Sequence, residues 1–434
     1  MPRIFGERPL GRAILYLAVL GTFFYASYGF ANEWTAAKSD VPSIVFDWER
    51  RVPFLAWTII PYWTTNAFYA ASLLLCRTRQ ELDCHAKRLL VVQIIAIACF
   101  LAFPLKFSWD RPETTGLEGY LFDALGQVDK PFNEAPSLHV ALTVILWDFY
   151  HKILPRAGLP VFAALSVLVI VSVMTTFQHH FIDIPTGLLL GFFCIWLFPD
   201  SGRSPFAAAR LTHEPGRLKL AGCYLLAAGV CVSLASAFGG TALWLWWPAF
   251  AFASVALAYV WLGPALFQKS EDGIIHYSVR WMLAPYLAGA RLNSRLWTRR
   301  DHACVEVTPA VFLGRFPSRA DAARFARVID LTAELSRPPY AGLWRSTPLL
   351  DLVAPDIAAL RGAADSIAQA APSDTVLVCC ALGYGRSAAA VAVWLVRSGY
   401  AANVEAALQS LAQVRPRIAV KAPQRARIEE AVRG

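Results

Sequence analysis

Long apolar runs dominate the first two thirds of the chain. Eight of them can be delimited, at residues 10–31, 53–76, 89–105, 137–150, 158–178, 184–199, 218–238 and 241–267. A bilayer core about 30 Å thick is crossed by roughly 20 apolar residues in helical conformation. The pattern therefore predicts about eight transmembrane helices, of which the fourth and sixth are short. No comparable run follows residue 268, which predicts a C-terminal domain outside the membrane.

Composition agrees with this division. Of the 434 residues, 56% are hydrophobic and only 16% are charged, whereas soluble domains carry about 25% charged residues. The first apolar run is long and no small-x-small cleavage site follows it, so we expect a retained helix rather than a signal peptide. The nine cysteines show neither metal-ligand spacing nor a disulfide framework. The sequence implies no metal and no cofactor.

Basic residues in the short loops predict the orientation. They gather before the first run and after the second, fourth and sixth runs: Arg3, Arg8, Arg12, Arg77, Arg79, Lys87, Arg88, Lys152, Arg156, Arg203, Arg210, Arg217 and Lys219. Loops rich in Lys and Arg stay in the cytoplasm. We therefore expect a multi-pass protein of the cell (inner) membrane, with the N-terminus and the C-terminal domain in the cytoplasm.

Net charge is concentrated in the C-terminal part. Of the total of +9, residues 268–434 contribute +7, from 21 Lys and Arg against 14 Asp and Glu. A basic domain beside a bilayer attracts anionic lipid, although a basic face also simply keeps a domain soluble, and both interpretations stay open. No motif indicates nucleic-acid binding.

Three polar clusters lie at the predicted extracytoplasmic ends of the apolar runs. They are Lys106–Pro112, Pro136–His139 and Gln178–Asp183. Cations and hydroxyls of this kind neutralise phosphoryl oxygens, one imidazole can attack phosphorus, and another can protonate the leaving alkoxide. His179 and Asp183 are four residues apart, so on a helix they would share a face.

The ordered clusters resemble the type 2 phosphatidic acid phosphatase superfamily over roughly residues 40–200, including its six-helix core. The resemblance implies that Lys106, Arg111 and Ser137 bind phosphate, that His139 is the acid for the leaving group, that His179 is the nucleophile and that Asp183 orients it. His180 is the alternative nucleophile, with a less suitable spacing to Asp183.

Two features depart from that family: the spacing from Lys106 to Arg111 is shorter than usual, and the third cluster lacks an Arg. Val173 follows Ser172 where the family has an Arg. The His-rich third cluster without this Arg resembles the sphingomyelin-synthase and inositol-phosphorylceramide-synthase branch, which moves headgroups between lipids. Transfer to a lipid alcohol is therefore an alternative to transfer to water.

From about residue 305 the pattern becomes α/β. Residues 328–331 and 376–380 are predicted strands, and residues 347–351 form another strand or a loop edge. The strand at residues 376–380 ends at Cys380. It leads into a Gly-containing loop, Arg386 and a helix that ends before Gly399. Backbone N–H groups of such a loop form an anion site and lower the pKa of a thiol.

This stretch resembles the dual-specificity branch of the protein tyrosine phosphatase superfamily over roughly residues 305–430. The resemblance implies that Cys380 is the nucleophile, that Arg386 binds phosphate and that the Ser387 hydroxyl helps the thiolate leave. It also implies that Gly383 and Gly385 belong to the phosphate-binding loop and that Asp351 is the general acid. Asp356 is the second choice for the acid, and Asp330 is expected to be structural. Cys379 stands where the family has a His.

The sequence thus predicts a polytopic α-helical membrane bundle plus a cytoplasmic α/β cysteine-phosphatase domain. The expected parts are a lipid-phosphatase-like six-helix domain (1–200), two further transmembrane helices (201–267), an interfacial connector (268–304) and a dual-specificity phosphatase-like domain (305–434). The expected function is a bifunctional membrane phosphatase acting on phospholipid phosphate esters or another phosphorylated substrate. The alternatives are a phospholipid headgroup transferase joined to a protein phosphatase, and a sensor in which one site only binds phosphate.

Overall fold

The computed structural model describes residues 8–200 and 204–433, in two compact units, residues 1–204 and 205–434. Each unit is described by itself. Arg3 and Arg203, which contribute to the predicted orientation, lie outside the described residues.

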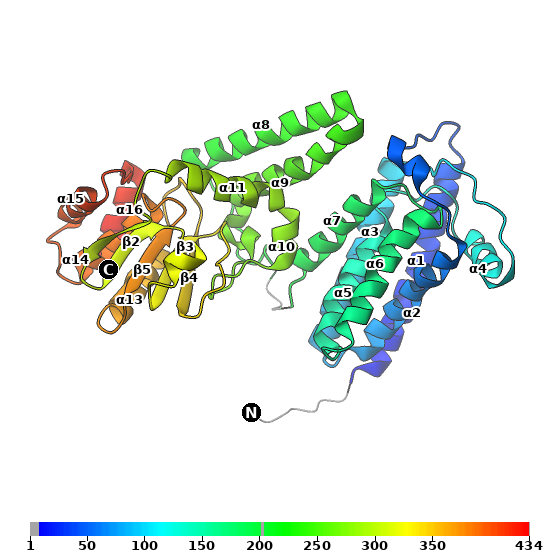
Figure 1. Cartoon of the computed structure of the whole chain (residues 1–434), viewed down its shortest axis with the longest axis horizontal. Coiled ribbons are helices and arrows are strands. Elements are labelled where there is room, and N and C mark those ends of the chain that lie inside the picture. Colours follow the sequence, from blue (N-terminus) through cyan, green and yellow to red (C-terminus); the bar gives the residue numbers. More distant parts are fainter. Residues whose placement is uncertain (1–7, 201–203, 434) are drawn as a thin grey trace. The chain divides into compact units, whose positions relative to one another are not determined.

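The first unit is helical (Figure 1). Its α-helices are α1 (Leu10–Ala36), α2 (Ile59–Leu75), α3 (Arg79–Ala102), α4 (Gly116–Gly126), α5 (Leu138–Ile153), α6 (Leu159–Thr175) and α7 (Asp183–Leu197), with short 3₁₀ turns η1 (Asp47–Arg51) and η2 (Ala56–Thr58). Each of the first six predicted runs is helical. Helix α4 was not predicted, because its 11 residues form too short an apolar segment to span a membrane.

Four helical segments of the described chain are long and apolar enough to cross a membrane: Leu10–Ala36, Arg79–Ala102, Pro215–Phe238 and Gly240–Phe267. Leu159–Thr175 and Asp183–Leu197 are apolar but shorter. These segments are compatible with a membrane protein, while the number of eight spans stays a prediction.

Helices α5 and α7 pack unusually closely because α7 presents two glycines to α5. A Cβ atom added at Gly187 would lie 2.6 Å from the carbonyl oxygen of Ser137, and one at Gly191 would lie 2.7 Å from Cβ of Val144. Small residues four apart allow helix backbones to approach in membrane bundles. This contact fixes the starts of both helices, where two of the three polar clusters lie.

A buried ion pair marks the opposite end of α5. Arg88 on α3 donates to Asp148 on α5 at 2.7 Å, and both side chains are almost completely buried. Arg88 Nε also donates to the carbonyl oxygen of Phe198 at 2.8 Å. The pair joins α3, α5 and the end of α7, so the bundle is tied at both ends.

We expect Gly191→Val to lower the thermal stability of the purified protein. The added Cβ and its two methyl groups cannot fit against Val144, and overpacking of this kind costs about 1–3 kcal/mol. Gly222→Val on α8 is the matched control, because nothing lies within 4 Å of a Cβ added there. Equal melting temperatures for the two variants would contradict the close α5–α7 contact.

The second unit begins with an apolar helical hairpin. It consists of α8 (Pro215–Phe238) and a broken second arm made of η3 (Gly240–Leu245), α9 (Trp246–Leu257), the π-helical turn η4 (Ala258–Leu262) and η5 (Gly263–Phe267). Two connector helices follow, α10 (Tyr277–Met282) and α11 (Ala284–Trp297). The region predicted as an interfacial connector (268–304) thus contains two short helices, and Pro285 lies in the first turn of α11.

A five-stranded mixed sheet forms the rest of this unit (Figure 1). Its strands are β1 (Cys304–Thr308), β2 (Val311–Arg315), β3 (Arg327–Thr332), β4 (Leu343–Leu349) and β5 (Val376–Cys380), in the order β1-β2-β5-β3-β4. Only β1 is antiparallel to its neighbour. Helices α12 (Arg319–Ala322), α13 (Ile357–Ala370), α14 (Arg386–Arg397), α15 (Val404–Val414) and α16 (Ala422–Arg433) complete the domain.

The alternation of side chains along the central strand β5 separates the two adjacent cysteines. Val376, Val378 and Cys380 belong to the apolar cluster that contains α13 and α14. Leu377 and Cys379 belong to the cluster on the other face. Because successive residues of a strand point to opposite faces, only Cys380 faces the helix that follows the loop.

Candidate active sites

In the first unit, the second and third polar clusters meet at the starts of α5 and α7. Nδ1 of His179 lies 3.1 Å from Oδ2 of Asp183, and the backbone N–H of Ser137 donates to the carbonyl oxygen of Asp183 at 3.1 Å. His179 lies in the turn before α7 rather than on one helix with Asp183, so the expected helical geometry was wrong although the two side chains do meet. With Nδ1 directed at Asp183, Nε2 is the nitrogen that can face a substrate.

His180 is held on both sides of its ring. Its Nε2 accepts the backbone N–H of Ser108 at 3.2 Å, so Nδ1 carries the proton that is donated to Oε2 of Glu49 at 3.0 Å. Glu49 is fully buried and also accepts the backbone N–H groups of Phe46 and Phe181. His180 therefore ties the first and third clusters to η1, and this use of both nitrogens disfavours it as the alternative nucleophile.

Glu134 was missed from the sequence because it lies far from His179 along the chain. Its Oε2 lies 3.7 Å from Nδ1 of His179, and both side chains are buried. Burial, and then the negative charge of Asp183, raise the pKa of Glu134 well above its usual range, which favours a neutral carboxyl. Ligand atoms of Glu134, His179 and Asp183 lie within 4.8 Å of one another and could hold a metal ion, but binding one would require Glu134 to lose its proton.

The remaining predicted residues of this site have different surroundings. The His139 ring stacks on Tyr62 with ring centroids 3.8 Å apart, and the Arg111 guanidinium lies 4.5 Å from the centre of the Phe122 ring. The side chain of Lys106 is exposed. Ser137 is the N-cap of α5, where its hydroxyl accepts the N–H of Val140. The structure thus brings together Ser137, His179 and Asp183, while Lys106 lies on an exposed loop.

In the second unit, the loop after β5 is held with its carbonyl groups facing outward. The carbonyl oxygen of Ala381 accepts from Ser294 Oγ at 2.5 Å, that of Leu382 from Arg415 at 2.9 Å, and that of Tyr384 from the N–H of Ala419 at 3.0 Å. Outward carbonyl groups leave N–H groups to point inward, which creates an anion-binding concavity. Ser294 belongs to connector helix α11, so the connector is part of the support of the loop.

The thiol of Cys380 lies at the floor of this loop. The backbone N–H of Gly383 donates to its sulfur at 3.3 Å, and the hydroxyl of Ser387 donates at 3.2 Å. Both contacts place a hydrogen-bond donor at the sulfur. Gly383 has φ +78°, and a Cβ there would lie 2.6 Å from the backbone of Gly314. The loop therefore depends on glycine at this position.

Arg386 is bound by acidic groups in this structure. It donates to both carboxylate oxygens of Glu334, at 2.8 and 2.6 Å, and its Nε lies 3.3 Å from Oδ1 of Asp351. Burial alone would lower the pKa of Arg386, but Asp351 and Glu334 raise it well above its ordinary value. The guanidinium is therefore charged, and Glu334, which the sequence gave no reason to select, fixes its position.

The three aspartates considered for the general acid have different surroundings. Asp356 is the N-cap of α13, and Asp330 is buried against Lys269, Thr332 and Trp344. Asp351 is 40% exposed and lies beside Arg386. Its backbone carbonyl accepts a hydrogen bond from the hydroxyl of Tyr259 at 3.2 Å. Of the three, Asp351 alone has a carboxylate at the loop, and the apolar hairpin contacts it through Tyr259.

An open cavity of about 830 Å³ lies at the mouth of this loop. Its lining combines exposed apolar side chains, Leu296, Trp297 and Leu352, with the cations Arg299, Arg300 and Arg417. Asp351 and Tyr384 also line it. A ligand entering here meets apolar surface and positive charge together.

We expect Cys379→Ala to retain most of the p-nitrophenyl phosphate hydrolysis of the C-terminal domain, and Cys380→Ser to abolish it. Burial raises the pKa of Cys379 well above that of a free thiol, and its side chain belongs to the apolar cluster of Phe316 and Trp344, on the face away from the loop. The replacement removes one buried sulfur, which lowers stability by only about 1 kcal/mol. A loss as large as that of Cys380→Ser would show that Cys379 itself takes part.

Comparison with known families and structures supports the class of the first unit. Residues 86–203 match the model of the PAP2 superfamily, a segment that contains every residue predicted for the membrane site. The chain therefore contains a PAP2 superfamily domain, and this domain supports a phosphoric monoester hydrolase. Comparison with curated proteins gave no match.

Solved structures similar to the chain include phosphatases of the tyrosine and dual-specificity type. Human DUSP28 is 23% identical, with 31% of this chain and 97% of that chain covered and a TM-score of 0.28. The active form of Tk-PTP is 22% identical, with 30% of this chain and 95% of that chain covered and a TM-score of 0.27. PTPMT1 in complex with PI(5)P is 17% identical, with 30% of this chain and 96% of that chain covered and a TM-score of 0.28. At these identities and TM-scores the similarities do not bear on what the domain does.

Proposed function

We propose that the protein is a bifunctional membrane phosphatase that acts on phospholipid phosphate esters, with a histidine nucleophile in the first unit and a cysteine nucleophile in the second. The observation that carries the proposal is that each unit holds one nucleophilic side chain already oriented by hydrogen-bond partners. These are His179 with Asp183, and Cys380 with Gly383 and Ser387. We also propose the predicted orientation, with the first site outside the cytoplasm and the second inside.

At the membrane site, Nε2 of His179 attacks phosphorus and the bond from phosphorus to the alcohol oxygen breaks. His139 gives its proton to the departing alkoxide, and Asp183 stabilises the charge that develops on His179. Arg111, Ser137 and Lys106 bind the phosphoryl oxygens, which requires movement of the exposed Lys106 loop. A water molecule then attacks the phosphohistidine, with His139 accepting its proton, and phosphate is released.

At the cytoplasmic site, the Cys380 thiolate attacks phosphorus while the loop N–H groups and Arg386 bind the phosphoryl oxygens. Asp351 protonates the leaving alcohol. Water then hydrolyses the thiophosphate, with Asp351 as base and the Ser387 hydroxyl stabilising the departing thiolate. Glu334 acts as a positioning residue, because it holds Arg386 beside the loop before substrate arrives.

A phospholipid fits the cytoplasmic site better than a soluble phosphoester does. The mouth of the site carries Leu296, Trp297 and Leu352 beside three arginines. Apolar and cationic side chains in one surface suit the boundary between anionic headgroups and acyl chains. The apolar hairpin of the same unit contacts the loop that carries Asp351.

The two sites are tested by phosphate release from phosphatidylglycerophosphate and phosphatidic acid by the purified protein in detergent. We expect His179→Ala to abolish release at one site and Cys380→Ser to abolish it at the other, so that the double variant is inactive. If wild type releases phosphate from neither lipid, the proposal is wrong. If phosphate appears only on an added lipid alcohol, the first site is a headgroup transferase.

Neither mechanism uses a metal, so a chelator serves as the accompanying control. Release of phosphate should be unchanged by excess EDTA in wild type and in both single variants. A loss at the membrane site alone would assign the cluster of Glu134, His179 and Asp183 to a metal and would contradict the histidine-nucleophile mechanism.

We expect Tyr259→Phe to slow the cytoplasmic site selectively for poor leaving groups. The lost hydrogen bond to the Asp351 carbonyl has a net worth of about 0.5–1.5 kcal/mol, which corresponds to roughly a twofold to tenfold fall in kcat for phenyl phosphate. The leaving group of p-nitrophenyl phosphate departs without protonation by the acid, so kcat for this substrate should be almost unchanged. Tyr400→Phe, at an exposed position, is the matched control. An equal fall for both substrates would refute a role through Asp351.

A further inference from the structure

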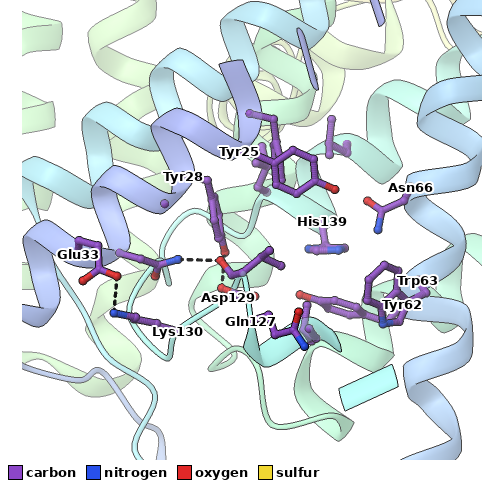
Figure 2. Close-up of a pocket in the computed structure, with 17 residues that line it drawn as sticks. Tyr25, Tyr28, Glu33, Tyr62, Trp63, Asn66, Gln127, Asp129, Lys130 and His139 are labelled. Carbon is purple, nitrogen blue, oxygen red and sulfur yellow. Dashed lines mark hydrogen bonds and ion pairs between the residues drawn. The ribbon is translucent and has the colours of Figure 1, made fainter. Parts of the chain in front are cut away.

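The first unit contains a cavity beside His139. It has a volume of about 250 Å³ and is lined by side chains of α1, α2, α5 and the segment between α4 and α5. Figure 2 shows Tyr25, Asn66, Tyr62 and Gln127 around the His139 ring. The cavity is therefore lined in part by His139, the residue that we propose protonates the leaving alcohol.

Two buried polar groups of this cavity have no hydrogen-bond partner in the described part of the chain. They are the hydroxyl of Tyr62, whose residue is 1% exposed, and the amide oxygen Oδ1 of Asn32, whose residue is 2% exposed. An unpaired buried polar group costs about 1–3 kcal/mol. Such groups are retained where a ligand supplies the missing partner, and here one is a hydroxyl and the other an acceptor.

The carboxylates that line the cavity already have partners. Glu33 pairs with Lys130 at 2.5 Å, and the Asp129 carboxylate accepts from the Tyr28 hydroxyl at 2.8 Å and lies within the field of Arg111. A cationic headgroup would find aromatic rings here, but both lining carboxylates are already bound by Lys130 and Tyr28. The lining instead offers hydroxyl, amide and carboxylate groups, which suit a neutral ligand with several hydroxyl groups.

We propose that this cavity binds the alcohol part of the phosphoester, and that this alcohol is hydroxylated. The membrane site then acts on a phosphomonoester carried by a hydroxylated headgroup, such as a glycerol, rather than on one attached directly to a diacylated glycerol. The inference rests on the proposed function, because it places the alcohol beside His139, which protonates it. Hydroxyl groups of the headgroup bond to Tyr62 and Asn32, and Tyr25, Asn66 and Gln127 surround them.

Binding is measured in the full-length protein in detergent, in a His179→Ala, Cys380→Ser background that cannot turn over the probes. Isothermal titration with sn-glycerol 3-phosphate, inorganic phosphate and phosphocholine compares three phosphates that differ only in what they carry. We expect glycerol phosphate to bind about tenfold tighter than inorganic phosphate, and phosphocholine to bind no tighter. The cytoplasmic site is the same in every variant, so any binding of the probes there contributes equally to every titration.

Tyr62→Phe supplies the decisive comparison. It keeps the ring that stacks on His139 and removes only the unpaired hydroxyl, so the free protein should be at least as stable as before. We expect the advantage of glycerol phosphate over inorganic phosphate to fall roughly twofold to tenfold. Tyr120→Phe, on an exposed tyrosine of α4 outside the cavity, should leave the ratio unchanged.

Three outcomes overturn the proposal: glycerol phosphate binding no tighter than phosphate, tighter binding of phosphocholine, or an unchanged ratio in Tyr62→Phe. Absence of binding by all three probes overturns it as well. Phosphate release by the Cys380→Ser enzyme separates this failure from that of the proposed function. A site that hydrolyses lipid phosphate without preferring phosphatidylglycerophosphate over phosphatidic acid remains a phosphatase, but not one with this cavity as its headgroup site.

Discussion

The close contact of α5 and α7 is the constraint on which the membrane site depends. Gly187 and Gly191 let the two backbones approach to a separation that no larger residue permits. The N–H of Ser137 can then reach the carbonyl oxygen of Asp183, and the starts of two helices are fixed against each other. His139, one residue into α5, and His179, in the turn before α7, acquire their positions from this contact rather than from their own hydrogen bonds alone.

The cytoplasmic site follows a related principle with different parts. A phosphate-binding loop must direct its N–H groups inward, and this is possible only if its carbonyl groups find partners outside. Ser294, Arg415 and the N–H of Ala419 supply those partners. Cys379 packs in the apolar face away from the loop and supplies none. The connector helix, through Ser294, is therefore part of the support of the loop.

In both units a buried glutamate fixes the position of an ionisable side chain by hydrogen bonds. Glu334 holds Arg386, and Glu49 holds His180. In each case a buried carboxylate is satisfied by several donors, which is the condition under which a buried charge stabilises rather than disrupts a protein. The second unit adds a link that an isolated phosphatase domain would lack, since Tyr259 of the apolar hairpin bonds to the backbone of Asp351.

The sequence by itself determined the secondary structure of the apolar runs, the central strand before Cys380 and the helix after Arg386. These features depend on composition and periodicity, which are local. It also selected the residues of the three membrane clusters, because their side-chain chemistry is distinctive. Only the tertiary structure decided that Glu49, Glu134 and Glu334 contact the histidines and Arg386, that Cys379 faces away from the loop, and that a polar cavity adjoins His139. These facts depend on contacts between segments far apart in the chain, and no local pattern specifies which distant segments pack together.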